Sequence, residues 1–403
     1  MPTVPHVAVI GGGPAGLRAA EVAASGGARV TLFDAMPSVG RKFLIAGKSG
    51  LNLTNEEPLP QFLDRYSGTD LPQPEWRTRF ETFDNHDLRE WAASLGVGTF
   101  VSAGGKVVPE SMKAAPLLRR WVSRLRALGV TFRMRHRWSG IGADRRIEFS
   151  TPAGTCSEHA DAVVLALGGA SWPQTGSDGQ WLDNLREYGI RITPFAPANV
   201  GWESDWPTGL IEAVEGAPLK NIAVQVAGQR SLGELVITRY GLEGAPLYRL
   251  TPLIRNALRP ELEIDLKPTL TQSEIGSKLG GLQRNFVREA RRRLNLSQAA
   301  AALLKHLPDR GPWRNPEQIA REIKHCKISL TRPRPIAEAI SSAGGIAWRS
   351  IDQQLMLEQL PGIFLAGEMI DWEAPTGGYL LQACFTTGTH AGLAALDWAR
   401  PHP

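Results

Sequence analysis

Short apolar runs open the chain and alternate with glycine turns and an alanine-rich stretch. His6–Ile10 predicts a buried strand, Pro14–Ser25 a helix and Arg29–Phe33 a second strand. This strand–helix–strand order is the opening of a doubly wound parallel sheet. Ala162–Leu167 is a later continuous apolar run that stops at a glycine pair, which is typical of a central parallel strand.

Helical periodicity follows in two places before residue 130. Asn85–Leu95 and Met112–Leu128 predict helices, and the second carries a row of Leu and Trp residues along one face. Val130–Arg135 alternates as a strand does. Residues 36–62, in contrast, predict mainly loop.

The pattern changes after about residue 193. Three short strand signals, at Ile222–Val226, Glu234–Ile237 and Leu262–Leu266, are separated by Pro and Gly, and Arg-rich amphipathic helices are predicted over 272–324. From Gly362 onward the pattern of the parallel sheet returns, with a buried strand and a long helix.

These patterns predict an α/β chain with two domains. The first, residues 1–192 together with 341–403, is a discontinuous doubly wound (Rossmann-like) domain. The second, residues 193–340, is an inserted α+β substrate domain. We expect it to hold a small β unit over about 193–268 and a helical cap over about 269–328.

Composition indicates a soluble globular protein, with 42% apolar and 21% charged residues. No apolar run approaches the ~18 residues of a membrane span, and no signal-peptide pattern precedes the first strand. Cys156, Cys326 and Cys384 form no C-x-x-C pair, which argues for a reducing compartment. We therefore expect a cytoplasmic protein without membrane contact, disulfide or metal site.

Positive charge gathers in one stretch. The net charge is +5, and residues 251–340 hold 17 Lys+Arg against 9 Asp+Glu. Such runs usually form a solvated helical face, but the same surface suits an anionic partner such as RNA or a CoA-type substrate. The solvated face is the favoured interpretation, and the anionic partner stays open.

A glycine motif lies between the first strand and the first helix. Residues 11–16 fit G-x-G-x-x-G, and an aspartate ends the next strand. The glycines permit a tight turn, close approach of a pyrophosphate and packing of the helix on the sheet, and the helix N-terminus attracts phosphates. The carboxylate could accept hydrogen bonds from a ribose diol. The predicted dinucleotide-binding residues are Gly11, Gly13, Pro14, Ala15, Gly16 and Asp34.

Three further motifs favour FAD over NAD. Gly40-Arg41-Lys42 places cations near the phosphates, Gly168 lies in a turn like the Ala-Thr-Gly turn of glutathione-reductase-type folds, and Gly367-Glu368 resembles their Gly-Asp motif, whose carboxylate holds the ribityl chain. Trp138 lies where such folds pass the backbone beside the adenine. We therefore predict noncovalent FAD in a domain of this type. Residues 150–300 carry no second glycine motif, so NAD(P)H is expected only as a transient reductant.

Several segments together resemble the HI0933-like flavoproteins over nearly the whole chain. They are Gly40–Lys42, Leu51–Asn55, Ala339–Gly345, Gly362–Asp371 and Thr376–Gln382. The resemblance implies FAD, a three-part architecture and oxidative or reductive chemistry. Members of the family include bile-acid ene reductases, aminoacetone oxidases and a ribosomal RNA dihydrouridine synthase. The resemblance also implies that the cofactor is contacted by Gly47, Asn52, Gly377, Gly378 and Tyr379.

Three segments depart from the family pattern, and all three are expected to face the flavin or the substrate. The family's Gly-Gly-Gly-Arg-Cys-Asn is here Gly47–Asn52, without the Arg and the Cys, so chemistry assigned to that Cys does not carry over. Its Thr-His-x-Gly-x-Ser-Gly-Pro is here Thr238–Ala245, and its Asp-Val-Asp-Gly is here Asp371–Ala374. The candidate catalytic residues are Lys48, as a cation or proton donor, and Tyr240 and Glu243, as proton donors or substrate anchors.

The leading interpretation is an FAD-dependent oxidoreductase. It would pass a hydride through flavin N5 to or from a small unsaturated or amine-type organic substrate. An RNA-directed flavin reductase is the first alternative, and a flavin-binding sensor without turnover is the second. The sequence leaves open whether the enzyme works as a reductase or as an oxidase.

Overall fold

Two compact units make up the chain. The computed structural model describes residues 4–48, 50–142, 146–307 and 313–400. One unit, here called the sheet unit, comprises Met1–Ala196 and Ile340–Pro403, and the inserted unit comprises Pro197–Ala339. The sheet unit is therefore assembled from the two ends of the sequence.

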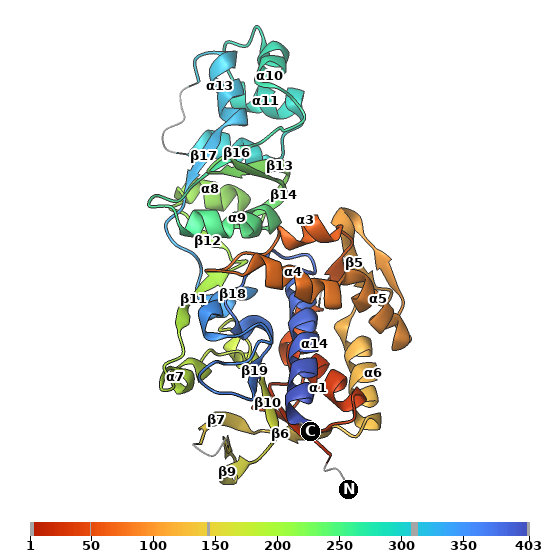
Figure 1. Cartoon of the computed structure of the whole chain (residues 1–403). Helices are drawn as coiled ribbons and strands as arrows, with labels where there is room; N and C mark the ends of the chain where they lie inside the picture. The colour runs from red at the N-terminus through yellow and green to blue at the C-terminus, as the bar shows by residue number, and fades with distance from the viewer. Residues whose placement is uncertain (1–3, 49, 143–145, 308–312, 401–403) are drawn as a thin grey trace. The chain divides into compact units, whose positions relative to one another are not determined.

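A five-stranded parallel sheet forms the centre of the sheet unit (Figure 1). The two adjacent inner strands at 6–10 and 162–165 are buried along their whole length, because a strand covered on both faces needs apolar residues at successive positions. In spatial order the strands are β19 (Ile363–Leu365), β10 (Ala162–Leu165), β1 (His6–Ile10), β2 (Arg29–Asp34) and β6 (Thr131–Met134).

Two helices from opposite ends of the chain, α1 (Pro14–Ser25) and α14 (Tyr379–Ala399), pack side by side (Figure 1). A Cβ at Gly388 would lie 2.4 Å from the Ala15 carbonyl oxygen, and one at Gly392 would lie 2.7 Å from that of Ala19. Both positions therefore need glycine. The pairing of 388 with 15 and of 392 with 19 also shows that the helices run in the same direction.

Several other elements of the sheet unit were not predicted from the sequence, and two stretches illustrate why. Residues 36–62, predicted as loop, contain α2 and α3, which are too short to give a periodic signal. Residues 137–158 form an antiparallel three-stranded meander that the pattern did not indicate. These elements are α2 (Arg41–Ala46), β3 (Thr54–Asn55), α3 (Leu59–Leu63), α4 (Gln73–Thr82), α5 (Asn85–Ser94), β4 (Thr99–Val101), β5 (Lys106–Pro109), α6 (Ala114–Ala127), β7 (Arg137–Ile141), β8 (Ile147–Thr151), β9 (Gly154–Glu158), α7 (Trp181–Arg186), β11 (Ile192–Ala198) and β18 (Ser341–Ile346).

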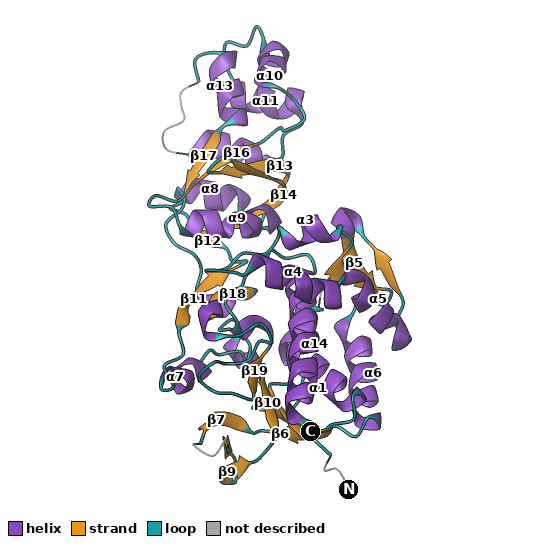
Figure 2. Cartoon of the chain, in the orientation of Figure 1, coloured by secondary structure: helices purple, strands orange, loops and turns teal. Residues whose placement is uncertain are grey.

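The inserted unit has a six-stranded antiparallel sheet and its own apolar core (Figure 2). Its strands in spatial order are β12 (Trp202–Glu203), β15 (Gly241–Glu243), β14 (Gln229–Thr238), β13 (Pro218–Val226), β16 (Glu261–Asp265) and β17 (Cys326–Ser329). Its helices are α8 (Thr208–Val214), α9 (Ala245–Arg255), α10 (Gln272–Leu279), α11 (Phe286–Leu294), α12 (Gln298–His306) and α13 (Pro316–Lys324). The predicted fold class, a doubly wound α/β domain with an inserted α+β unit, is confirmed.

A buried carboxylate joins α1 to α5 and α6. Glu21 is 4% exposed, and its Oε2 accepts hydrogen bonds from the indole N–H groups of Trp91 and Trp121, each at 2.9 Å. Arg124 donates to Oε1 at 3.1 Å, and Arg18 donates to Oε2 at 3.3 Å. A buried charge costs several kcal/mol unless it is paired and hydrogen-bonded, and these four donors offset that cost.

We expect Glu21→Ala to lower the free energy of unfolding by about 3–5 kcal/mol, because it leaves Arg18 and two indole N–H groups without their acceptor in the core. Guanidinium unfolding followed by tryptophan fluorescence measures the change. Glu90→Ala, on the exposed face of α5, is the matched control and should stay within about 0.5 kcal/mol of the parent. Equal effects of the two substitutions would contradict the buried-hub interpretation.

Candidate functional site

The turn between β1 and α1 requires glycine for three different reasons. Gly11 has φ +108°, and a Cβ there would lie 2.1 Å from the Ala166 carbonyl oxygen. A Cβ at Gly16 would lie 1.9 Å from the Gly11 carbonyl oxygen, so Gly16 lets the helix pack against the turn. At Gly13 no heavy atom of the described residues, apart from Gly13 and its near neighbours in the chain, lies within 4 Å of the Cβ position, and Gly13 lines a pocket.

The first turn of α1 has free N–H groups. Gly13 is the N-cap residue, and no side chain of the described residues caps the helix. The first N–H groups of a helix have no intrahelical partner, and the helix dipole places partial positive charge there. The open space at Gly13 therefore leads to a ready-made phosphate site.

Asp34 lies at the end of β2 beside this turn. Its Oδ2 accepts from the Gly12 N–H and its Oδ1 from the Met36 N–H, both at 2.7 Å. Burial raises the pKa of the carboxyl group, and the two backbone N–H donors oppose that shift. A carboxylate has about four acceptor positions, so two remain for the hydroxyls of a ribose.

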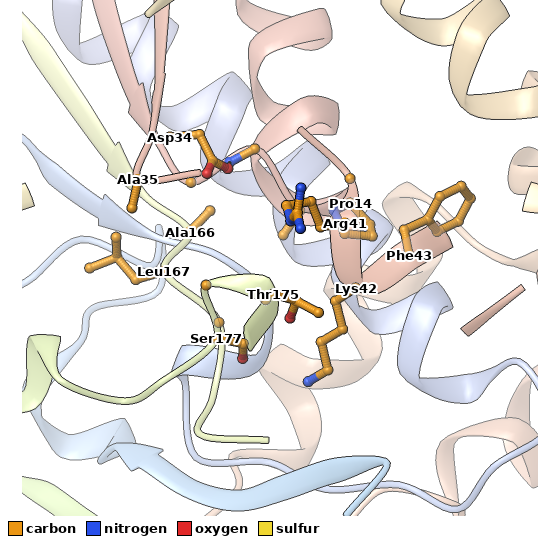
Figure 3. Close-up of a pocket in the computed structure, with 18 of the residues that line it drawn as sticks. Pro14, Asp34, Ala35, Arg41, Lys42, Phe43, Ala166, Leu167, Thr175 and Ser177 are labelled. Carbon is orange, nitrogen blue, oxygen red and sulfur yellow. The ribbon is translucent and has the colours of Figure 1, made fainter. Parts of the chain in front are cut away.

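These groups surround one pocket at the carboxyl ends of β1, β2, β10 and β19, the edge where open α/β sheets bind ligands (Figure 3). The side chains of Asp34, Arg41 and Lys42 are seen on its wall in Figure 3. The sequence-predicted residues that line it are Gly11, Gly13, Pro14, Ala15, Asp34, Gly40, Arg41, Lys42, Trp138, Gly168, Gly367 and Glu368.

An ion pair crosses one side of the pocket. The Lys42 ammonium lies 2.7 Å from Glu368 Oε2 and donates to the Ser171 hydroxyl at 2.6 Å. The other carboxylate oxygen of Glu368 accepts from the Ser342 N–H at 2.9 Å. The pair thus joins the start of α2 to the residues that follow β19.

The other predicted cofactor residues lie outside the pocket lining. Gly378 has φ +108°, and a Cβ there would lie 2.2 Å from the Thr54 carbonyl oxygen. The Tyr379 ring is buried in an aromatic cluster and its carbonyl accepts from Tyr66 Oη at 2.7 Å, so this ring serves the core. Beside Gly378 and Tyr379, the predicted residues in this group are Gly16, Gly47, Asn52 and Gly377.

The candidate catalytic residues fall in both units. Lys48 is exposed after α2, and Ser49 in the same segment lies outside the described residues. In the inserted unit the Tyr240 hydroxyl donates to Glu243, and the Arg334 guanidinium lies 4.5 Å from the centre of the Tyr240 ring. Burial and the bond to Glu243 raise the Tyr240 pKa well above its usual range, which keeps the phenol protonated.

Among the pocket-lining side chains that the sequence analysis missed, five carry a polar or ionisable group: Ser38, His136, Thr175, Ser177 and Cys384. The sequence could have indicated His136, because it lies two residues before the predicted cofactor residue Trp138. Side chains two residues apart in an extended chain point to the same side. Burial, and after it the Glu368 carboxylate, raises the pKa of the Cys384 thiol to about 12. This thiol is therefore not a thiolate nucleophile at neutral pH.

The pocket suits a flavin dinucleotide. It offers an open cradle at Gly13, a helix N-terminus for phosphate and a carboxylate for ribose. Two buried donors on its wall, Arg41 Nε and Trp138 Nε1, have no hydrogen-bond partner among the described residues. In the same residues no metal-binding group of His, Cys, Asp or Glu occurs, and no helix is long and apolar enough to cross a membrane.

Comparison with known proteins gives one family and several full-length relatives. The family model described as HI0933-like protein Rossmann domain matches residues 5–394. A 3-dehydro-bile acid delta(4,6)-reductase of Clostridium scindens is 28% identical, covering 97% of this chain and 99% of its own. A ribosomal RNA dihydrouridine synthase of Haemophilus influenzae is 22% identical, with coverages of 96% and 97%.

Solved structures share the fold at low identity. A 3-ketosteroid-delta4-(5alpha)-dehydrogenase from Rhodococcus jostii, in complex with 4-androstene-3,17-dione, matches with a TM-score of 0.54 and 16% identity over 97% of both chains. A flavocytochrome c3 fumarate reductase matches with a TM-score of 0.52 and 15% identity, over 99% of this chain and 79% of its own.

Asp34→Ala should weaken FAD binding about ten-fold or more, since one or two hydrogen bonds to a charged acceptor are lost, worth about 1.5–3 kcal/mol. Titration of flavin-free protein with FAD measures the affinity. Asp161→Ala is a control, because that carboxylate also accepts a backbone N–H beside the sheet, from His6 at 2.7 Å, and is absent from the pocket lining. Unchanged FAD affinity in Asp34→Ala would exclude Asp34 as the ribose acceptor.

Proposed function

Because this chain belongs to the HI0933-like Rossmann domain family and is a flavin-dependent oxidoreductase, we propose that it transfers a hydride through N5 of bound FAD to or from a small unsaturated or amine-type substrate. One observation carries the proposal: a single pocket is lined by Gly13, by the Asp34 carboxylate and by the Lys42–Glu368 pair. A glycine turn that admits a pyrophosphate and a carboxylate that accepts from a ribose are the features of a dinucleotide site.

FAD, when bound, supplies a two-electron hydride exchange at N5. The chain's own residues provide the binding and the charge. The N-terminus of α1 and Arg41 are suited to the pyrophosphate, Asp34 to the adenosine ribose and Glu368 to the ribityl hydroxyls. The N-terminus of α14 carries partial positive charge that would stabilise a reduced flavin.

Relatives favour an unsaturated acceptor over an amine donor. The printed names of the bile-acid reductase and the dihydrouridine synthase both describe saturation of carbon–carbon double bonds. For this chain we therefore propose a double bond conjugated to a carbonyl, which accepts hydride at one carbon and a proton at the other. Lys48 and the Tyr240–Glu243 pair are the candidate proton donors or substrate anchors.

NAD(P)H is the proposed reductant, bound transiently. The sheet of the inserted unit is antiparallel, whereas a dedicated dinucleotide domain has a parallel sheet. A nicotinamide that binds only during reduction needs no domain of its own.

Anaerobic stopped-flow of the flavin-loaded protein tests this function. Mixing with NADH and NADPH in turn should bleach the flavin rapidly with one of them, and 2-cyclohexenone should then restore its absorbance. Slow bleaching by both nucleotides, with fast reoxidation in air, would contradict a reductase and favour an oxidase.

Tyr240→Phe separates proton donation from hydride supply in the same instrument. We expect reoxidation by the enone to slow about 10²-fold while bleaching by the nucleotide is unchanged, because only the oxidative half-reaction needs the proton. Tyr248→Phe, a second half-buried tyrosine of the inserted unit, is the control. Equal rates in Tyr240→Phe and the parent would remove Tyr240 from the proposed machinery.

RNA is the second candidate substrate, and one surface favours it. Arg288, Arg291 and Arg292 are exposed on α11 at the spacing that places them on one face. Glu289 offsets part of their charge, since its carboxylate lies 2.9 Å from Arg292 and 3.8 Å from Arg288. This local pairing favours the solvated-face interpretation.

Reversal of the three arginines to glutamate should leave RNA affinity weak and close to that of the parent at physiological salt, with the flavin spectrum intact. Filter binding of single-stranded RNA across a salt series measures it. RNA would instead become the first candidate if the parent's affinity fell steeply with salt and the triple variant lost that affinity. The expected slope is a fall of about 0.7 in log K per ten-fold rise in salt for each phosphate that the protein neutralises.

A further inference from the structure

An arginine lies over the ring of the candidate proton donor in the inserted unit. The central carbon of the Arg334 guanidinium is 4.5 Å from the centre of the Tyr240 ring. The Tyr240 hydroxyl donates to the carboxylate of Glu243. All three residues belong to the same compact unit. The phenol therefore has an anion at its oxygen and a cation over its ring.

The backbone around Arg334 holds the side chain in this place. Pro333 and Pro335 flank it, and a proline fixes its own φ and disfavours the helical region for the residue before it. The Arg334 N–H donates to the Gly201 carbonyl oxygen at 2.8 Å. A Cβ at Gly201 would lie 2.9 Å from Tyr240 Oη, so the residue that accepts from Arg334 lies directly against the phenol.

Two carboxylates also hold the Arg334 guanidinium. Its Nη1 donates to Glu203 at 2.8 Å, and its Nε and Nη2 donate to the two oxygens of Glu338 at 3.0 and 2.9 Å. Arg332 Nε donates to the other oxygen of Glu203 at 2.7 Å. Because all three nitrogens of the Arg334 guanidinium have carboxylate partners, the group cannot turn toward Glu243 without breaking these bonds. It presents its flat face to the phenol ring instead.

Loss of the Tyr240 proton to a substrate would leave a phenolate beside the Glu243 carboxylate. Burial disfavours the phenolate, and the neighbouring carboxylate disfavours it further. A cation over the face of an aromatic ring is attracted to it, and a negative charge on the ring strengthens that attraction. The other titratable groups around the phenol are Tyr248 on α9 and, through Arg334, the carboxylates of Glu203 and Glu338. Within this set, Arg334 is the cation in contact with the ring.

We propose that Arg334 is a positioning residue that acts through Tyr240 by stabilising its phenolate. When the phenol protonates the substrate, the Tyr240 O–H bond breaks and a C–H bond forms at the carbon next to the one that has received the hydride. The negative charge stays on the phenolate, under the guanidinium, until a proton from solvent restores the phenol. The inference rests on the proposed role of Tyr240 as the proton donor.

Titration of the protein with Tyr240 replaced by 3,5-difluorotyrosine tests this contact without any turnover. The fluorinated phenol is more acidic than tyrosine, so its ionisation can be followed by absorbance while the protein stays folded. Arg334→Met should raise the pKa of this phenol by about one unit, because the cation that stabilises the phenolate is lost. Arg334→Lys should restore part of the difference, because it keeps the charge but not the planar guanidinium.

Arg332→Met is the matched control for this titration. Arg332 shares the Glu203 carboxylate with Arg334, but its side chain is 74% exposed. The pKa of the difluorotyrosine should therefore be unchanged in Arg332→Met. Circular dichroism checks that each variant is folded.

The two half-reactions show whether the effect of Arg334 passes through Tyr240. Arg334→Met should slow reoxidation by 2-cyclohexenone about ten-fold, matching one pKa unit, and leave bleaching by the nucleotide unchanged. In the Tyr240→Phe background the same substitution should cause no further slowing, because the residue through which it acts is gone.

An unchanged pKa of the difluorotyrosine in Arg334→Met would overturn the inference. The same ten-fold slowing by Arg334→Met in the Tyr240→Phe background would overturn it as well. Either result, with Tyr240→Phe itself slow, leaves the donor role of Tyr240 intact. Reoxidation of Tyr240→Phe at the parent rate is the separate outcome that ends the donor role and, with it, this inference.

Discussion

The close approach of α1 and α14 is the constraint on which the site depends. Gly388 and Gly392 let the two backbones meet at Ala15 and Ala19, and the helices run the same way. α14 therefore begins about eight residues, or roughly 12 Å, ahead of α1 along the shared direction. The N-termini of both helices, which carry partial positive charge, therefore point in the same direction and are offset along the helix axes by a fixed distance. Such an arrangement suits a flavin dinucleotide, in which the pyrophosphate and the reduced flavin carry negative charge at two separate points.

The glycine turn then depends on that packing. Gly11 is held against Ala166 and Gly16 against Gly11, so α1 cannot shift without moving the phosphate cradle. Glu21 holds the opposite side of α1 through Trp91 and Trp121. The helix that we propose for the pyrophosphate is thus positioned by glycine contacts on one side and by a buried charge on another.

The local pattern of apolar residues predicted α1 and three strands of the parallel sheet. The predicted helix Pro14–Ser25 coincides with α1, and the strands at 6–10, 29–33 and 162–167 lie within two residues of those found. Long apolar runs and periodic helices give strong signals because burial decides their pattern. The six-residue α2 gave none, because two turns are too few to show a period.

The site was predictable where a motif fixes the backbone and not where distant side chains meet. Asp34, Gly11 and Gly13 follow from their spacing in sequence, and they line the pocket. The Lys42–Glu368 pair joins residues 326 apart, and the contact needs the folded sheet. Tyr379 shows the converse, since its place beside two glycines indicated the cofactor, whereas its ring packs with Phe62 and Tyr66.

The sheet unit is built from two segments that are far apart in the sequence, and this determines the order in which its parts can fold during synthesis. During synthesis β1, α1 and β2 leave the ribosome while α14 and β19 are still untranslated. At about 5–20 residues per second, roughly tens of seconds separate Asp34 from Cys384. Throughout that interval the small-residue face of α1 is uncovered and one wall of the pocket does not exist. The pocket is therefore complete only late in synthesis, after its C-terminal lining residues have been added to the chain.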